Sequence, residues 1–254
     1  MTFLNYVGIE FQKVKRSRIL PILLIAPLLV VISGVSSLAM YLTPEYPNPW
    51  AAMFIQSSLL FGFYLLPLSM VVVCVMISHR ETQSNGILKM LALPIDISKM
   101  AVAKFFVLAI FLFIEILIFL VTFIIAGLYA MHSAQIDAVV PISYLVKWCV
   151  GLFVTSLPAI AVMWAITVYF EKPLLSIGLN FLLIVPGVLV GVTPLWVAYP
   201  YCYSGQLVSS ALHSISTAAD EDVFELFPFL LCAIIIFVLG IFISVKFFGR
   251  RERR

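Results

Sequence analysis

The stretch HRETQSNGILKMLALPIDISKMAVAK, residues 79–104, is a short polar interruption in a chain that is otherwise almost continuously apolar. One long apolar run precedes it and another follows it. Its basic residues are Arg80, Lys89, Lys99 and Lys104. Loops rich in lysine and arginine are retained on the cytoplasmic side of a membrane, so we expect a cytoplasmic connection between two membrane spans here.

A short helix is predicted inside this connection. Ile87, Leu88 and Leu91 have helical spacing and would form one apolar face. Pro94 would end the helix, because proline has no amide donor and disfavours helical geometry in the residue before it. A cytoplasmic helix has no lipid to cover an apolar face. We therefore predict that the cytoplasmic segment, residues 79–99, docks against a partner protein.

The composition is that of an integral membrane protein. Of the 254 residues, 63% are hydrophobic and 11% are charged, and the mean hydropathy is +1.16. A bilayer core about 30 Å thick requires about 20 apolar residues per helix. The runs of sufficient length are residues 19–41, 51–78, 101–131, 142–170, 174–192 and 227–248. They do not alternate in polarity as barrel strands do. The predicted fold is therefore an all-α membrane protein with six transmembrane helices, in a single domain of residues 1–254.

Residues 1–18 are predicted to form an amphipathic helix on the membrane surface. The apolar stripe of this helix consists of Leu4, Val7, Phe11 and Val14. The charged residues nearest the first span are Glu10, Lys13, Lys15, Arg16 and Arg18. This pattern is typical of an interfacial helix whose basic residues meet anionic headgroups. The alternative is a charged flank that only sets the topology.

The orientation follows from the distribution of charge. Apart from Lys147, the basic residues fall on one side of the six spans, so both termini are expected to be cytoplasmic. The acidic residues on the outer side are Glu45, Asp137, Asp220, Glu221, Asp222 and Glu225. The last outer segment, residues 193–226, begins with the proline- and aromatic-rich sequence TPLWVAYPYCYSG. It is expected to be re-entrant or interfacial, the alternative being an aromatic belt at the end of the fifth span.

One ionisable residue lies deep in a predicted span. Glu115 is in the middle of residues 101–131, more than about 20 Å of helix from either end. A charge at that depth costs about 3 kcal/mol, so Glu115 should face protein or water, or be protonated. Two interpretations stay open. Glu115, with Asn180, is a polar contact on a translocation path or at a subunit seam; or it is a neutral carboxyl that hydrogen-bonds a neighbouring span near Asn180 or Ser156.

Motifs for enzymatic chemistry are not found in the sequence. Nothing reads GxxxxGK followed by serine or threonine, so the chain has no P-loop for ATP. Neither an HExxH zinc motif nor a GxSxG nucleophile elbow is present. The cysteines are Cys74, Cys149, Cys202 and Cys232, and no pair has metal-ligand spacing. We predict no catalytic residue, no metal and no cofactor in this chain.

The cytoplasmic segment and the layout together resemble a known family. Glu81, the run GILKML at residues 86–91, residues 93–94 and Lys99 resemble the coupling segment of type-two ABC exporter permeases. They are similar in particular to the small permeases of lantibiotic-immunity transporters. The layout is similar as well: an N-terminal elbow helix, six spans, a coupling helix between spans two and three, and an irregular outer segment before the last span.

The resemblance implies a permease subunit of an ATP-driven exporter in a bacterial plasma membrane, which expels antimicrobial peptides such as lantibiotics and so confers immunity. A second permease, identical or different, and a dimer of ATPase subunits carrying ATP and Mg would complete the transporter. The implied ATPase contacts are Glu81, Gly86, Ile87, Leu88, Lys89, Leu91 and Pro94. The implied outer gate, residues 194–212, has as candidates Pro194, Trp196, Tyr199, Tyr201 and Tyr203.

The expected partners also include membrane lipids and a cationic peptide substrate, and no nucleic acid. The acidic outer residues could attract such a peptide, or they could merely mirror the basic residues retained inside. Two alternatives to peptide export remain. One is export of another drug, antibiotic or lipid. The other, in a different class, is an ATP-independent intramembrane enzyme or channel centred on Glu115.

Overall fold

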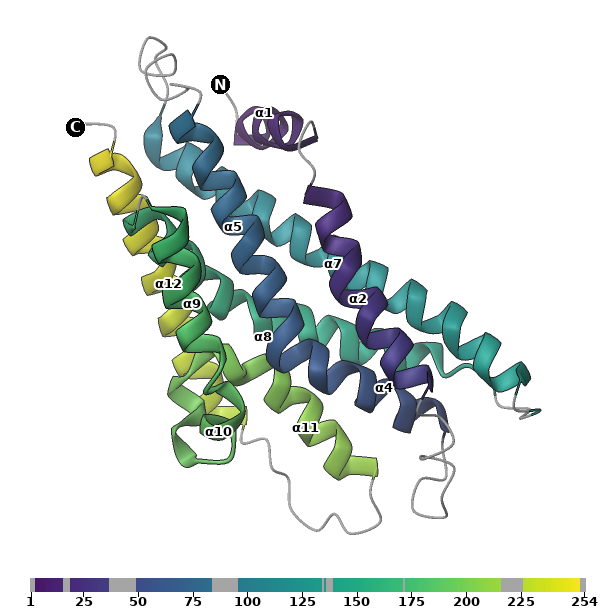
Figure 1. Cartoon of the computed structure of the whole chain (residues 1–254). Helices are drawn as coiled ribbons and strands as arrows, with labels where there is room; N and C mark the ends of the chain where they lie inside the picture. Colours follow the sequence, from purple (N-terminus) through teal and green to yellow (C-terminus); the bar gives the residue numbers. More distant parts are fainter. Residues whose placement is uncertain are drawn as a thin grey trace.

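The structure, a computed structural model, describes residues 3–15, 19–36, 49–83, 96–133, 135, 139–170, 172–215 and 226–251. All regular secondary structure in these residues is helical, as Figure 1 shows. The α-helices are α1 (Phe3–Lys15), α2 (Ile19–Ser36), α4 (Pro49–Leu60), α5 (Leu66–Gln83), α7 (Ile97–Ser133), α8 (Ile142–Tyr169), α9 (Pro173–Ile184), α10 (Gly187–Gly191), α11 (Tyr203–Ile215) and α12 (Leu226–Arg251). The remaining elements are the π-helical η1 (Phe61–Leu65) and the 3₁₀-helical η2 (Pro194–Ala198) and η3 (Pro200–Cys202).

The predicted membrane spans are confirmed. Among the described residues, six helical stretches are long and apolar enough to cross a membrane: Ile19–Ser36, Met53–His79, Ser98–Ser133, Ile142–Tyr169, Pro173–Gly191 and Phe227–Phe248. Each corresponds to one of the runs expected from the sequence. The protein is therefore an all-α, multi-pass membrane protein.

The second and fourth spans form the centre of the bundle. They are the most buried of the six, and α8 packs against α5, α7, α11 and α12. Aromatic rings fill the space between the second span and α7; the rings of Phe61 and Phe119 stack with their centroids 4.6 Å apart. The other spans expose large apolar side chains, such as Ile32 (67%) and Phe242 (63%). Exposed apolar faces of this kind are compatible with contact with the acyl chains of a bilayer.

The third span is much longer than a bilayer requires. With 37 residues, α7 extends about 55 Å at the standard helical rise, against about 30 Å for the hydrocarbon core. Figure 1 shows α7 running obliquely across the bundle. Its first turns lie at the end of the bundle where α1 is found, and α1 packs against α7. Helix α7 is therefore both a membrane span and the helix on which α1 packs.

The second span contains a π-helical turn at its middle. Between α4 and α5, the residues of η1 adopt i→i+5 bonding, and the Leu66 N–H donates to the Phe61 carbonyl. The Gly62 carbonyl accepts a 2.7 Å hydrogen bond from the Ser204 hydroxyl, which comes from the start of α11. π-Turns are rare and occur frequently at functional sites. This one joins the second span to the outer segment of the chain.

The fifth span is interrupted near its C-terminal end. α9 ends at Ile184, and Pro186 precedes the short helix α10. Proline has no N–H for the preceding turn, so the interruption is expected at this position. The chain then turns through η2 and η3 into α11, which packs on α4, α8 and η1.

Candidate functional site

Two regions can carry the function: α1 with the start of α7 at one end of the bundle, and residues 194–203 at the other. Figure 1 shows α1 lying across the end of the bundle where both termini of the chain are found. We refer to residues 194–203 as the fold-back segment.

The buried face of α1 differs from the predicted stripe. Tyr6, Val7 and Glu10 are buried, whereas Leu4 is 75% exposed. Phe11 is 38% exposed, and its ring stacks on Phe111 of α7 at 6.1 Å. The stripe that would face the membrane therefore stays a prediction, and of its described members Val7 is buried in the protein while Leu4 and Phe11 are exposed.

A buried ion pair holds α1 on α7. Lys104 Nζ lies 2.6 Å from Glu10 Oε2, and Lys13 Nζ lies 2.6 Å from Glu10 Oε1. Lys104 is 1% exposed, and its ammonium also lies 5.7 Å from the ring centroid of Phe248 in α12. Burial would raise the pKa of Glu10, but the charges and hydrogen bonds of Lys104 and Lys13 hold it below 4.5. Lys104 therefore links α1, α7 and α12 at one point.

A second contact joins α1 to the residue where α7 begins. The Asp96 N–H donates a 3.3 Å hydrogen bond to the Tyr6 hydroxyl. The Asp96 carboxylate caps α7 by accepting from the N–H groups of Ser98 and Lys99. Asp96 belongs to the predicted cytoplasmic segment. Neither the Glu10–Lys104 pair nor this cap was predicted from the sequence. Only the cap has a local signal, an aspartate just before an apolar helix.

The predicted coupling helix lies outside the described residues. This applies to Gly86, Ile87, Leu88, Lys89, Leu91 and Pro94, and to the side chain of Glu81, whose backbone is in α5. The described helices on either side end at Gln83 and begin at Ile97. The α1 contacts are therefore made within the first turns after the predicted coupling helix.

Glu115 contacts neither of the partners suggested by the sequence. It is completely buried in α7, and its Oε1 lies 2.5 Å from the Ser69 hydroxyl of α5. The same hydroxyl lies 2.8 Å from the Leu66 carbonyl. A serine hydroxyl has one hydrogen, so it cannot donate to both. If Glu115 is neutral and donates to Ser69, which donates to Leu66, both bonds are made.

The second carboxyl oxygen of Glu115 has no partner. Among the described residues, Oε2 is buried without a hydrogen bond. An orphaned carbonyl oxygen is less costly than a buried charge, which agrees with a neutral carboxyl. Glu115 is thus a hydrogen-bonding contact between α5 and α7 in this conformation.

The fold-back segment is anchored to the middle of α9. The Tyr201 hydroxyl donates a 2.8 Å hydrogen bond to Asn180 Oδ1, and the Tyr199 hydroxyl donates to the Leu183 carbonyl. Asn180 is about 16 Å along the helix from Gly191, the end of the fifth span. Tyr201 is 2% exposed. The segment therefore returns from the end of the span toward its centre.

Aromatic packing fixes the rest of the fold-back segment. The Trp196 ring stacks on Phe229 of α12 at 5.8 Å, and the Tyr203 ring meets Phe229 edge-on at 4.9 Å. The Tyr203 hydroxyl donates to the Val197 carbonyl. Trp196, Tyr203 and Phe229 thus form a cluster that joins the segment to the sixth span, while Tyr199 and Tyr201 join it to the fifth.

A cavity of ≈330 Å³ lies beside this cluster. Its lining is partly polar and consists of Gly191, Val192, Thr193, Pro194, Trp196, Gln206 and Ser209. Of the outer-gate candidates, Pro194 and Trp196 line the cavity, while Tyr199, Tyr201 and Tyr203 anchor the segment. Within the described part of the chain, no group of three or more His, Cys, Asp or Glu side chains could hold a metal ion.

Comparison with known proteins gives the family. A family model described as "ABC-2 family transporter protein" matches residues 6–187, which is more than half of the chain. A search of curated proteins found no match. The matched region includes most of α1, the first four spans and most of the fifth. The chain therefore belongs to the ABC-2 transporter family, as a membrane permease subunit whose family implies an ABC ATPase partner.

Proposed function

We propose that this permease expels cationic antimicrobial peptides of the lantibiotic class from the membrane and thereby gives immunity to them. The observation that carries the proposal is the fold-back segment, which is anchored inside the fifth span and borders a partly polar cavity of ≈330 Å³. A peptide with apolar and charged faces needs an exit that offers both kinds of surface. The resemblance of residues 81–99 to the coupling segment of lantibiotic-immunity permeases supports the same substrate class.

In this proposal the N-terminus, the C-terminus and residues 79–99 face the cytoplasm of a bacterial cell. The charge distribution supports this orientation. A second permease, identical or different, encloses the pathway, and two ATPase subunits bind below it. Glu81 and residues 86–94 contact the ATPase.

Movement passes from the ATPase to the pathway through rigid helices. The ATPase biases an equilibrium between two arrangements of the spans, and the permease supplies those arrangements. The contacts of Tyr6 with Asp96 and of Glu10 with Lys104 support a path from the coupling segment to α7, since they tie α1 to the first turns after it. The π-turn in the second span and the Ser204–Gly62 hydrogen bond support a link from the spans to the fold-back segment.

The ATPase docking is tested by purification of the tagged permease in a gentle detergent, followed by mass spectrometry. We expect an ATPase to copurify with the wild type and to be lost when both Leu88 and Leu91 are replaced by Asp. The matched control is Ser84→Asp with Asn85→Asp, which adds the same charge to polar positions of the same segment. Recovery of no ATPase with the wild type under several mild conditions would overturn the proposal.

The substrate class is tested in cells that express the complete transporter. We expect survival in the presence of a lantibiotic to require an intact coupling segment, and to be lost in the Leu88→Asp, Leu91→Asp variant. Bacitracin and small cationic dyes are the comparison substrates. Protection against these compounds and not against lantibiotics would reject peptide export while leaving the permease assignment intact.

A further inference from the structure

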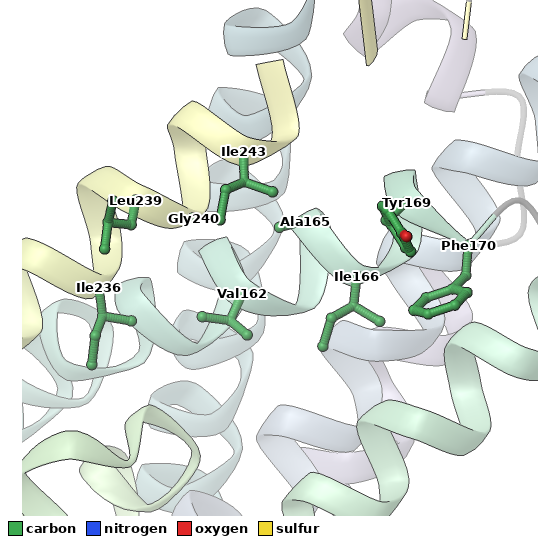
Figure 2. A pocket seen from close by; sticks show the side chains of 9 residues that line it. All are labelled: Val162, Ala165, Ile166, Tyr169, Phe170, Ile236, Leu239, Gly240 and Ile243. Atoms are coloured by element: carbon green, nitrogen blue, oxygen red, sulfur yellow. The ribbon is translucent and has the colours of Figure 1, made fainter. Parts of the chain in front are cut away.

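A second cavity lies on the outside of the bundle, at the end where α1 is found. Figure 2 shows its lining: Val162, Ala165, Ile166, Tyr169 and Phe170 from α8 and its C-cap, and Ile236, Leu239, Gly240 and Ile243 from α12. We call it the α8–α12 groove. Its volume is ≈300 Å³, and apart from the Tyr169 hydroxyl all its side chains are apolar.

The shape of the groove follows from two contacts between α8 and α12. At Gly240 the helices are so close that an added Cβ would lie 2.9 Å from the carbonyl carbon of Ala161. Toward the ends of both helices, the rings of Tyr169 and Phe247 meet edge-on at 4.7 Å. The groove lies beside these two points. Leu239 (52%) and Tyr169 (53%) are exposed, so the groove opens to the surroundings of the bundle.

The length of the groove fits one leaflet of a bilayer. Residues 236–243 extend about 10 Å along α12, and residues 162–170 about 12 Å along α8. A transmembrane helix of a second subunit would need a seam of about 30 Å, whereas half of that depth is available to an acyl chain. The groove is therefore too short for a spanning helix, and its length matches an acyl chain of one leaflet.

Two exposed lysines closely follow lining residues of the groove in the chain. Lys246 follows Ile243 by one helical turn, so it lies on the same face of α12, and it is exposed. Lys172 follows Phe170 closely and is also exposed. Basic residues at the edge of a bilayer attract anionic headgroups.

This end of the bundle is the same end at which α1 lies. Lys104 contacts both Glu10 of α1 and Phe248 of α12, so the last turns of α12 are level with the N-terminal helix. Tyr169 stands at the same level, and tyrosine prefers the headgroup region of a membrane. The lysines at the mouth are therefore at the height at which a phosphate headgroup would be found.

We propose that the α8–α12 groove is a binding site for an anionic phospholipid, with an acyl chain in the groove and its headgroup at Lys172 and Lys246. Nothing in this assignment depends on the substrate that is exported. The site would hold lipid of the leaflet at the α1 end of the bundle.

The test uses the full-length protein in nanodiscs of phosphatidylcholine that contain a few per cent of phosphatidylglycerol with a diazirine in its acyl chain. After illumination, labelled peptides are identified by mass spectrometry. We expect labelling of residues 162–170 and 236–243, and weaker labelling by phosphatidylcholine that carries the same diazirine. Equal labelling by the two lipids would overturn the proposal.

The variants separate the headgroup from the acyl chain. Each exposed lysine contributes about fivefold to the affinity for an anionic lipid, so Lys172→Gln with Lys246→Gln should lower phosphatidylglycerol labelling of the groove about thirtyfold. Lys147→Gln, at the opposite end of α8, is the matched control and should change nothing. An equal decrease with Lys147→Gln would refute the headgroup assignment.

Filling the groove tests the acyl chain. Ala165→Phe should abolish labelling of residues 236–243, whereas Gly178→Phe, at a position of α9 with open space around it, should not. Cross-links between the grooves of two copies of the chain, without lipid labelling, would show that a second subunit covers this surface and would overturn the proposal.

Discussion

The carboxylate of Glu10 and the ammonium of Lys104 form a buried ion pair, 2.6 Å long, between two residues that are 94 positions apart in the chain. Both side chains are almost completely enclosed, and Lys104 also faces the ring of Phe248. A buried charge without its partner is strongly unfavourable, so the pair makes the position of α1 on α7 specific. Helix α1 is therefore an integral part of the packed protein.

Removing one partner of this pair should destabilise the protein. Lys104→Met leaves Glu10 buried with Lys13 as its remaining described ionic partner, and we expect a loss of about 3–5 kcal/mol. The double variant Glu10→Gln, Lys104→Met should recover much of this, because it leaves no buried charge. Thermal unfolding in detergent measures both. Lys99→Met, which removes the exposed pair with Asp96, is the control and should cost nothing measurable. If Lys104→Met behaves like this control, the pair has no structural role.

The docking of α1 should weaken in acid. The pKa of Glu10 is lower in the folded protein than its ordinary value of 4.5. A carboxyl whose pKa is lowered by folding stabilises the folded state fully at a pH above its ordinary pKa of about 4.5. This stabilisation is lost as the pH falls through the pKa of the folded state. A fluorophore on Cys introduced at the exposed position Gln12 should therefore report release of α1 only below about pH 4.5. In the Glu10→Gln variant the fluorescence should not depend on pH in this range. If this variant shows the same transition, the release of α1 is caused by another titrating group.

Glu115 should be replaceable by its neutral isostere. Because the Ser69 hydroxyl can donate only once, the hydrogen-bond chain to Leu66 is complete when Glu115 donates. Glu115→Gln keeps such a donor, so it should change stability by less than about 1 kcal/mol and leave export intact. Glu115→Ala should cost about 2–5 kcal/mol, since it leaves a cavity in the bundle. A folded Glu115→Gln protein that no longer exports would show that the carboxylate charge acts in transport.

The start of α11 should tolerate no side chain at Gly205. A Cβ there would lie 2.2 Å from the ring of Phe63 in η1, and the flanking residue Ser204 is bonded to Gly62. Gly205→Ala should therefore separate α11 from the π-turn, cost about 1–3 kcal/mol and reduce export. Gly178→Ala, which meets nothing within 4 Å, is the matched control. Unchanged unfolding temperature and export in Gly205→Ala would contradict a fixed contact between these elements.

Hydropathy predicted the spans well because the requirement for a membrane helix is local. About 20 consecutive apolar residues are enough, whatever lies beside them, and all six runs became helices close to their expected bounds. The interruption near Pro186 also had a local cause, the missing amide hydrogen. The helices that flank residues 37–48 and 84–95 are described only up to these residues.

The contacts of the outer-gate residues could be predicted only in part from the sequence. Their proline and aromatic content indicated irregular backbone, and that was observed in η2 and η3. The composition did not indicate which tyrosine would reach which span. The hydrogen bond from Tyr201 to Asn180 depends on the break after α9, which turns the chain back along its own span.

The sequence by itself determined the number of spans, the helix at the N-terminus and the membrane class, since these depend on residues that are neighbours in the chain. Only the tertiary structure decided that Glu10 pairs with Lys104 and that Glu115 meets Ser69 rather than Asn180 or Ser156. The reason is physical. A buried polar group must find a partner wherever packing brings one close, and packing depends on how the apolar surfaces of all the helices fit together.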